Sequence, residues 1–227
     1  MGDFMDFFDL HCDTLTECMD DGDSLLKNER DIDFERGSIF GRWNQVFAVF
    51  VPDSMDDSLV EGYFDSACDF YFDELKKKGD VFPILSSEDV RGHSRGVMLA
   101  MESSRGVGSL ERLEKLYERG LRLITLTWNH KNRAAGGCDE GGGLTDWGRE
   151  LVSKMEKLGI VTDVSHLSDR SFYDLCEFSD APFIASHSDA RAVHNEVRSL
   201  TDEQIKIIIE RGGLIGLNFY DRFLGGN

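Results

Sequence analysis

The chain has 227 residues, of which 41% are hydrophobic and 30% are charged, and it contains only three prolines. This composition predicts a single compact globular domain spanning residues 1–227. The formal net charge is −18, from 43 acidic and 25 basic residues. It argues against nucleic acids and anionic membranes as partners, because both would be repelled.

The N-terminus and the cysteines predict a cytoplasmic protein. The first residues are acidic and lack the basic region of a secretory signal, and no apolar run approaches the length that spans a bilayer. The five cysteines, at positions 12, 18, 68, 138 and 176, are odd in number and form no CxxC pair, as is typical of a reduced protein. We expect Cys12 to point away from its neighbours His11 and Asp13, because successive strand residues alternate between faces.

Seven short apolar runs bounded by turn residues predict strands. In chain order they span residues 4–13, 45–51, 97–102, 121–128, 160–166, 182–187 and 214–219. Helical segments separate most of these runs, and this alternation predicts a parallel sheet with right-handed crossovers. The pattern alone leaves a closed barrel and an open sheet as alternatives.

Four of the helical segments carry recognisable capping residues. They are expected over residues 57–78, over 110–119 behind Ser109, from Thr145 to residue 158, and from the capping box 201–204 to Gly212. A glycine follows each of them, which is typical of a helix C-terminus.

Four of the predicted strands end on residues that bind metal ions well. The first run leads into His11 and Asp13, the third into Glu102, the fifth into His166 and the sixth into His187. The carboxyl ends of parallel strands gather on one face, so these side chains are expected to converge. Strands so far apart in an open sheet could not share one compact site, which favours a (β/α)8 TIM-type barrel.

The joint arrangement carries more weight than any single pair. The HxD pair formed by His11 and Asp13 is expected by chance in a chain this rich in aspartate. Burying three imidazoles and two carboxylates together, however, is costly unless a cation compensates them. Mixed imidazole and carboxylate ligation suits zinc, with manganese, cobalt or iron as alternatives. A carboxylate can bridge two cations, so we expect Glu102 between them.

A glycine-rich segment at 136–143 lacks the Lys-Ser/Thr ending of a phosphate loop and contains two acidic residues. We therefore expect a mobile loop over the site rather than a nucleotide site. The sequence contains no serine nucleophile elbow and no HExxH motif.

Several longer motifs accompany these residues: DLHCDT at 9–14, the segment 121–137, GIVTDVSH at 159–166, SHS at 186–188, RSLTD at 198–202 and GGLIGLNFY at 212–220. Together they resemble the renal (membrane) dipeptidase family of binuclear zinc peptidases. The similarity spans nearly the whole chain, and its second half is the more specific.

This resemblance implies a site with two zinc ions and a substrate-binding arginine. His11 and Asp13 would hold one zinc, His166 and His187 would hold the other, and Glu102 would bridge them. Arg198 would grip the carboxylate of the substrate, and a guanidinium fork pairs bidentately with such a group.

The chain departs from the family pattern in two places. Trp128 follows the Leu-Thr pair where the family has a substrate-facing histidine, and His130 is the candidate to reach the substrate carbonyl oxygen instead. The family's eighth strand, with the aspartate that handles the proton, is absent from this sequence. We therefore expect a barrel that is incomplete at its C-terminus.

The leading hypothesis is a metal-dependent dipeptidase, a hydrolase of the metalloprotease type. A metal-bridging hydroxide positioned by Glu102 would attack the peptide bond of a dipeptide held by Arg198. One alternative is an amidohydrolase, lactonase or phosphoesterase on the same barrel. Another is a truncated, non-catalytic metal-binding module, whose unpaired edge strands favour association. A homodimer is also left open.

Overall fold

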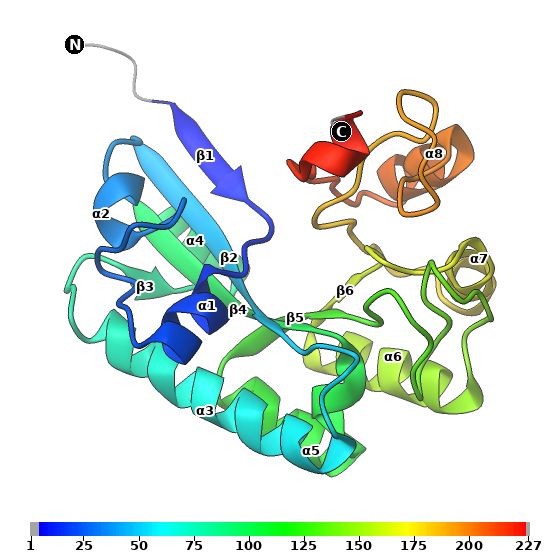
Figure 1. Cartoon of the computed structure of the whole chain (residues 1–227), viewed down its shortest axis with the longest axis horizontal. Coiled ribbons are helices and arrows are strands. Elements are labelled where there is room, and N and C mark those ends of the chain that lie inside the picture. The colour runs from blue at the N-terminus through cyan, green and yellow to red at the C-terminus, as the bar shows by residue number, and fades with distance from the viewer. Residues whose placement is uncertain (1–4, 226–227) are drawn as a thin grey trace.

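Residues 5–225 are described by a computed structural model of the chain and form an α/β fold around one parallel sheet (Figure 1). Along the sheet, five strands follow one another in chain order: β1 (Asp6–Asp9), β2 (Arg42–Phe50), β4 (Arg95–Glu102), β5 (Leu121–Thr125) and β6 (Val161–Asp163). All pairings between them are parallel, as predicted. Phe4, where the first predicted strand begins, lies outside the described residues.

The short strand β3 (Phe82–Pro83) was not predicted; it pairs in parallel with the start of β4. Two residues are too few to produce a recognisable periodicity.

The sixth and seventh predicted strands are reduced to single parallel bridges, between Asp163 and Ile184 and between Ala185 and Ile215. The prediction of full strands over 182–187 and 214–219 is therefore wrong. The cause is local: the backbone N–H groups of Ser186 and Asn218 donate to the side chains of Asp163 and Asp189 instead of extending the ladder. The described sheet is a parallel half-barrel.

The helices are α1 (Thr14–Asp21), α2 (Phe34–Gly37), α3 (Asp57–Leu75), α4 (Ser87–Gly92), α5 (Leu110–Glu118), α6 (Asp146–Leu158), α7 (Asp169–Phe178) and α8 (Asp202–Glu210). The expected N-caps are confirmed, since Ser109, Thr145 and Thr201 each accept a hydrogen bond from a backbone N–H of the first turn. Figure 1 shows α3, α5 and α6 along one side of the sheet. No helix among residues 5–225 is both long and apolar enough to cross a bilayer.

The two faces of the sheet are buried differently. Phe47 and Val49 of β2 belong to the large core that the helices cover. Val46 and Ala48, which alternate with them, form a smaller cluster with Ala100 and Leu123 on the other face. Glu102, the last residue of β4, lies at the carboxyl end of this second face, because it follows Ala100 by two positions.

The last predicted run packs closely against the first. A Cβ on Gly216 would lie 2.0 Å from the carbonyl oxygen of Ser186 and 3.3 Å from Cβ of Leu10. Only glycine fits this close approach. The segment around Gly216 therefore packs against Leu10 and Ser186, the residues that directly precede His11 and His187.

Candidate metal centre

The five predicted ligands lie together at the carboxyl ends of the strands. Oε1 of Glu102 is 3.0 Å from Nε2 of His166 and 3.4 Å from Nε2 of His187. Its other oxygen, Oε2, is 3.7 Å from Nε2 of His11. Nε2 of His11 is in turn 3.3 Å from Oδ1 of Asp13. The predicted convergence of these side chains is confirmed.

Different elements deliver these groups. Glu102 is the last residue of β4, whereas His11 and Asp13 occupy the connection from β1 to α1, with Asp13 at the N-cap of α1. His166 follows β6 in a left-handed backbone conformation with φ of 68°, and Ser103, next to Glu102, has φ of 77°. Residues other than glycine rarely adopt this conformation, and such strain concentrates at functional sites.

The hydrogen bond of His166 leaves its Nε2 without a proton. Its Nδ1 lies 2.7 Å from Oδ1 of Asn129, an amide oxygen that can only accept, so Nδ1 carries the hydrogen. The lone pair of Nε2 then faces Glu102 and also Nε2 of His187, only 2.9 Å away. Such a group of acceptors is repulsive by itself, and a bound cation would relieve the repulsion. The donor set therefore fits a metal ion.

Burial sets the protonation of the ligands. It lowers the pKa of His166 and His187 well below the ordinary value, and the charges of Arg198 and His11 act in the same direction. Both imidazoles are thus neutral and ready to ligate. Burial raises the pKa of Glu102 to about 8. For His11, burial lowers the pKa, but the carboxylates of Glu102 and Asp13 outweigh it and raise the value to about 9.

A cavity of about 710 Å³ opens onto all five ligands. Six aromatic or apolar residues also line it, next to polar ones such as Asn218 and Arg222; the six are Phe50, Trp128, Leu217, Phe219, Tyr220 and Phe223. The rings of Phe50 and Trp128 meet edge to face with centroids 5.0 Å apart. The site thus combines a polar floor with a wall suited to apolar side chains.

Cys12 packs against the large core that the helices cover, and it also contributes to the lining of the cavity beside His11 and Asp13. Its backbone still bonds to β2, since its N–H donates to the carbonyl oxygen of Val46 and its own carbonyl oxygen accepts from the N–H of Ala48.

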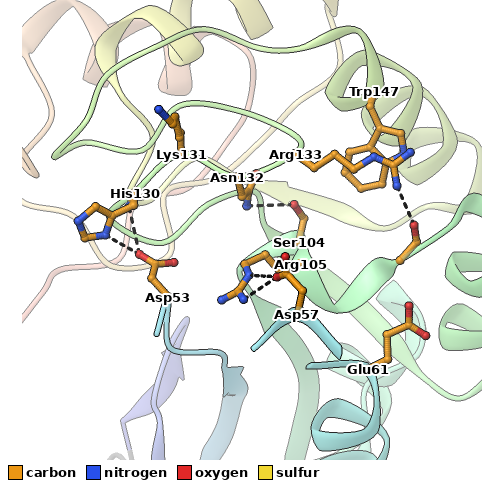
Figure 2. Close-up of a pocket in the computed structure, with 11 residues that line it drawn as sticks. Asp53, Asp57, Glu61, Ser104, Arg105, His130, Lys131, Asn132, Arg133 and Trp147 are labelled. Atoms are coloured by element: carbon orange, nitrogen blue, oxygen red, sulfur yellow. Dashed lines mark hydrogen bonds and ion pairs between the residues drawn. The ribbon is translucent and has the colours of Figure 1, made fainter. Parts of the chain in front are cut away.

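His130 is not brought into this cavity. It lines a neighbouring cavity of about 660 Å³, and its Nδ1 lies 2.7 Å from Oδ2 of Asp53 (Figure 2). Figure 2 shows the pair at one end of that cavity, with Arg133 and Trp147 at the other. Its side chain is 48% exposed, and the hydrogen bond with Asp53 raises its pKa.

Arg198 lies behind His187 and is not among the residues that line the metal-site cavity. Its guanidinium donates to Oγ of Ser188 and to the carbonyl oxygen of His187, both at 2.8 Å. It is buried, and burial lowers its pKa. Its Nε has no hydrogen-bond partner within the described part of the chain.

The glycine-rich segment 136–143 does not cover the site as was expected, but is hydrogen-bonded to the residues around His166. Among the described residues, none of this segment lines the cavity. The N–H of Cys138 donates to the carbonyl oxygen of His166 at 2.9 Å, and the N–H of Gly136 donates to Oγ of Ser171 at 2.9 Å. The first bond attaches the segment to the loop that carries His166, and the second attaches it to α7.

Sequence reasoning missed three polar residues that contact ligands or their partners, namely Asn129, Asp163 and Ser186. The available signal was weak. Asp163 is a charged residue inside an otherwise apolar run, and Asn129 directly follows Trp128.

Comparison with known proteins identifies relatives along the whole chain. A family model described as membrane dipeptidase (peptidase family M19) matches residues 3–227. A Klebsiella pneumoniae protein, described as an uncharacterized protein in the pqqA 5′ region, is 33% identical over 153 residues, covering 62% of this chain and 56% of that protein. An uncharacterized dipeptidase of Schizosaccharomyces pombe is 35% identical over 122 residues, covering 51% of this chain and 29% of that protein.

Solved structures share the fold. A crystal structure described as the dipeptidase AC, a metallopeptidase of family M19, superimposes with a TM-score of 0.88 at 26% identity and covers 97% of this chain and 74% of that one. A metallopeptidase from Rhodobacter sphaeroides, liganded with a phosphinate mimic of the dipeptide L-Ala-D-Ala, superimposes with a TM-score of 0.86 at 24% identity. There, 98% of this chain and 76% of that chain are covered.

This chain is shorter than the curated relatives that it matches. The aligned region spans about half of the Klebsiella protein, 56%, and about half, 47%, of a protein from Acinetobacter calcoaceticus that is 33% identical over 147 residues.

Proposed function

Because this chain belongs to the membrane dipeptidase family, peptidase family M19, we propose that it is a metal-dependent dipeptidase. One observation carries this proposal: Glu102 lies 3.0 to 3.7 Å from three imidazoles of distant segments, Asp13 lies 3.3 Å from one of them, and all five groups line one cavity. A bound cation would compensate these buried groups without the protons that the metal-free site takes up at Glu102 and His11.

The two oxygens of Glu102 face different partners, which supports a bridging role for this residue. Oε2 faces His11, and Oε1 faces His166 and His187. We assign His11 and Asp13 to one metal ion and His166 and His187 to a second, with zinc as the preferred metal and manganese, cobalt or iron as alternatives. When bound, such a pair supplies an activated water and polarises a carbonyl oxygen.

The residues of this chain would bind and orient the substrate. The aromatic wall of Phe50 and Trp128 would pack against its side chains and exclude water. We assign Arg198 to the carboxylate of the substrate, because its buried guanidinium adjoins His187 and its Nε has no hydrogen-bond partner among the described residues. We assign no role to His130 beyond its pair with Asp53.

The dipeptide is the substrate class that this assignment favours. The Rhodobacter sphaeroides relative was solved with a dipeptide mimic, and a buried arginine near the metal ligands would select substrates with a free carboxylate. We further propose that residues 1–227 belong to one catalytic domain of the (β/α)8 barrel type. The cytoplasmic location and the homodimer stay predictions from the sequence.

Metal analysis coupled to a panel of dipeptides tests the proposal. The purified protein should hold about two divalent ions per chain and hydrolyse dipeptides, and a chelator should abolish hydrolysis until zinc is returned. The variant His187→Ala should lose metal and activity together. Hydrolysis that persists without metal would refute the proposal, whereas hydrolysis of neutral lactones or phosphoesters in place of dipeptides would favour the alternative substrates.

A further inference from the structure

A line of buried polar groups runs behind His187, on the side away from Glu102. We propose that Asp163 and Ser186 are positioning residues that hold His187 as the Nδ1–H tautomer and thereby keep its Nε2 available as a ligand. The importance for metal binding rests on the proposed function, but the tautomer itself does not depend on it.

Asp163 is fully buried, and each of its oxygens accepts two hydrogen bonds. Oδ1 accepts from the backbone N–H groups of Ser165 at 3.0 Å and Ser186 at 2.9 Å. Oδ2 accepts from the hydroxyls of Thr125 and Ser186, both at 2.6 Å. With both oxygens engaged in this way, Asp163 orients its neighbours and is not itself a metal ligand.

The hydroxyl of Ser186 links Asp163 to His187. A carboxylate offers only acceptors, so the single hydroxyl hydrogen of Ser186 points to Asp163. The Ser186 oxygen is then left as an acceptor, and Nδ1 of His187 lies 2.7 Å from it. This short contact is a hydrogen bond only if Nδ1 carries the hydrogen. Nε2 of His187 consequently presents its lone pair to the site.

At Arg198, the other end of this row of hydrogen-bonded groups, the donor of the first bond also favours a Ser186 hydroxyl that donates to Asp163. Arg198 has only donors, and it donates to Oγ of Ser188 at 2.8 Å. Ser188 lies 3.3 Å from Oγ of Ser165, which lies 3.4 Å from Oγ of Ser186. With a donor-only group at one end and an acceptor-only group at the other, each hydroxyl in turn can accept from one neighbour and donate to the next.

The register of the sheet places Asp163 level with Glu102. Glu102 of β4 is in register with Thr125 of β5, and Thr125 is in register with Asp163 of β6. The metal-facing carboxylate and the orienting carboxylate therefore lie two strands apart in one layer. His166 obtains the same tautomer from Asn129, so both histidines present Nε2 to Glu102 by separate devices.

The variant Asp163→Asn tests the proposal because it keeps the shape and inverts the polarity. Its amide oxygen can still accept from the two backbone N–H groups, while its NH₂ group donates to Ser186. The Ser186 hydroxyl must then donate to Nδ1 of His187, which moves the imidazole hydrogen to Nε2. Long-range ¹H–¹⁵N spectra of the metal-free protein should report Nδ1–H for His187 in the wild type and Nε2–H in the variant.

Metal binding supplies a second measurement. In competition with a chromophoric chelator, Asp163→Asn should bind zinc roughly 10- to 100-fold more weakly than the wild type, the range typical of changes to the partners of metal ligands. Thr125→Val is the matched control, since it removes a hydrogen bond to the same carboxylate but leaves the polarity of Ser186 unchanged. It should retain the wild-type tautomer and zinc affinity.

Ser186→Ala provides an independent variant should Asp163→Asn fail to fold. It removes the acceptor of Nδ1, so the spectra should show His187 as a mixture of tautomers, with weaker zinc binding. A wild-type tautomer in either folded variant would overturn the proposal. If the wild-type protein does not hydrolyse dipeptides, only the proposed function is contradicted, because the tautomers are observed without metal or substrate.

Discussion

Replacing Glu102 by glutamine should stabilise the metal-free protein at high pH while it weakens metal binding. Glu102 is 2% exposed, and burial raises its pKa from 4.5 to about 8. In the metal-free protein, the folded state therefore holds a proton that the unfolded chain has released between pH 4.5 and 8. Stability falls as the pH rises through this window.

The size of the effect follows from the pKa values. One pKa unit corresponds to about 1.4 kcal/mol, so the change from 4.5 to about 8 amounts to roughly 5 kcal/mol of lost stability above pH 8. His11 acts in the same direction, because its raised pKa of about 9 stabilises the fold below pH 6.5, an effect that is lost through pH 9. At pH 9.5, metal-free Glu102→Gln should thus be more stable than the wild type by up to roughly 5 kcal/mol.

Urea unfolding at pH 9.5 with a chelator measures the first effect, and metal analysis of the untreated protein measures the second. An amide cannot replace a bridging carboxylate, so the variant should hold at most one metal ion per chain. The result that would refute the reasoning is a variant that keeps two metal ions per chain and is less stable than the wild type when metal-free.

Glu74→Gln is a matched control at another buried glutamate. The Glu74 carboxylate accepts from Oγ of Ser24 at 2.5 Å and from the N–H of Leu25 at 2.9 Å, and it pairs with Lys77. Its loss should destabilise the protein by about 1–3 kcal/mol with or without chelator. The metal content should stay at the wild-type value, because this pair lies outside the metal-site cavity.

Three further predictions follow from the site. Removal of metal by a chelator should lower the melting temperature, and zinc should restore it, since ligands that bind only the folded state stabilise it; an unchanged melting temperature would contradict the metal centre. Arg198→Lys should raise KM for dipeptides at least tenfold with a smaller change in kcat, because a bidentate carboxylate pair is lost; an unchanged KM would remove Arg198 from the substrate site. His130→Ala should change kcat/KM less than about twofold, because His130 lies in the neighbouring cavity and is paired with Asp53; a tenfold loss would return it to the substrate site.

Much of the sheet and the convergence of the candidate ligands could be predicted because both follow from local patterns. Apolar runs gave the order of β1, β2, β4, β5 and β6, and the parallel arrangement then brought His11, Glu102 and His187 to one face. Caps such as Thr201 were predictable for the same reason, since the bond joins residues three positions apart.

The features that sequence reasoning missed depend on contacts between distant segments. The hydrogen bond from His166 to Asn129 spans 37 positions, and the one from Ser186 to Asp163 spans 23. A serine or asparagine has many local uses, so its residue type does not identify such a partner. For Arg198, the sequence motif suggested a contact with the substrate. Its hydrogen bond to the carbonyl oxygen of His187 could be found only from the structure.

In the proposed function, different parts of this chain would bind the metal ions and enclose the substrate. The five candidate ligands all lie between His11 and His187, at the end of β4 or in the segments that follow β1, β6 and the bridge at Ala185. Much of the apolar wall comes instead from residues 217–223, in which Phe219 and Tyr220 are 79% and 61% exposed. Changes in that wall should therefore alter which peptides fit, whereas the positions of the imidazoles depend on the buried polar groups behind them. Specificity and metal affinity can then vary separately in this fold.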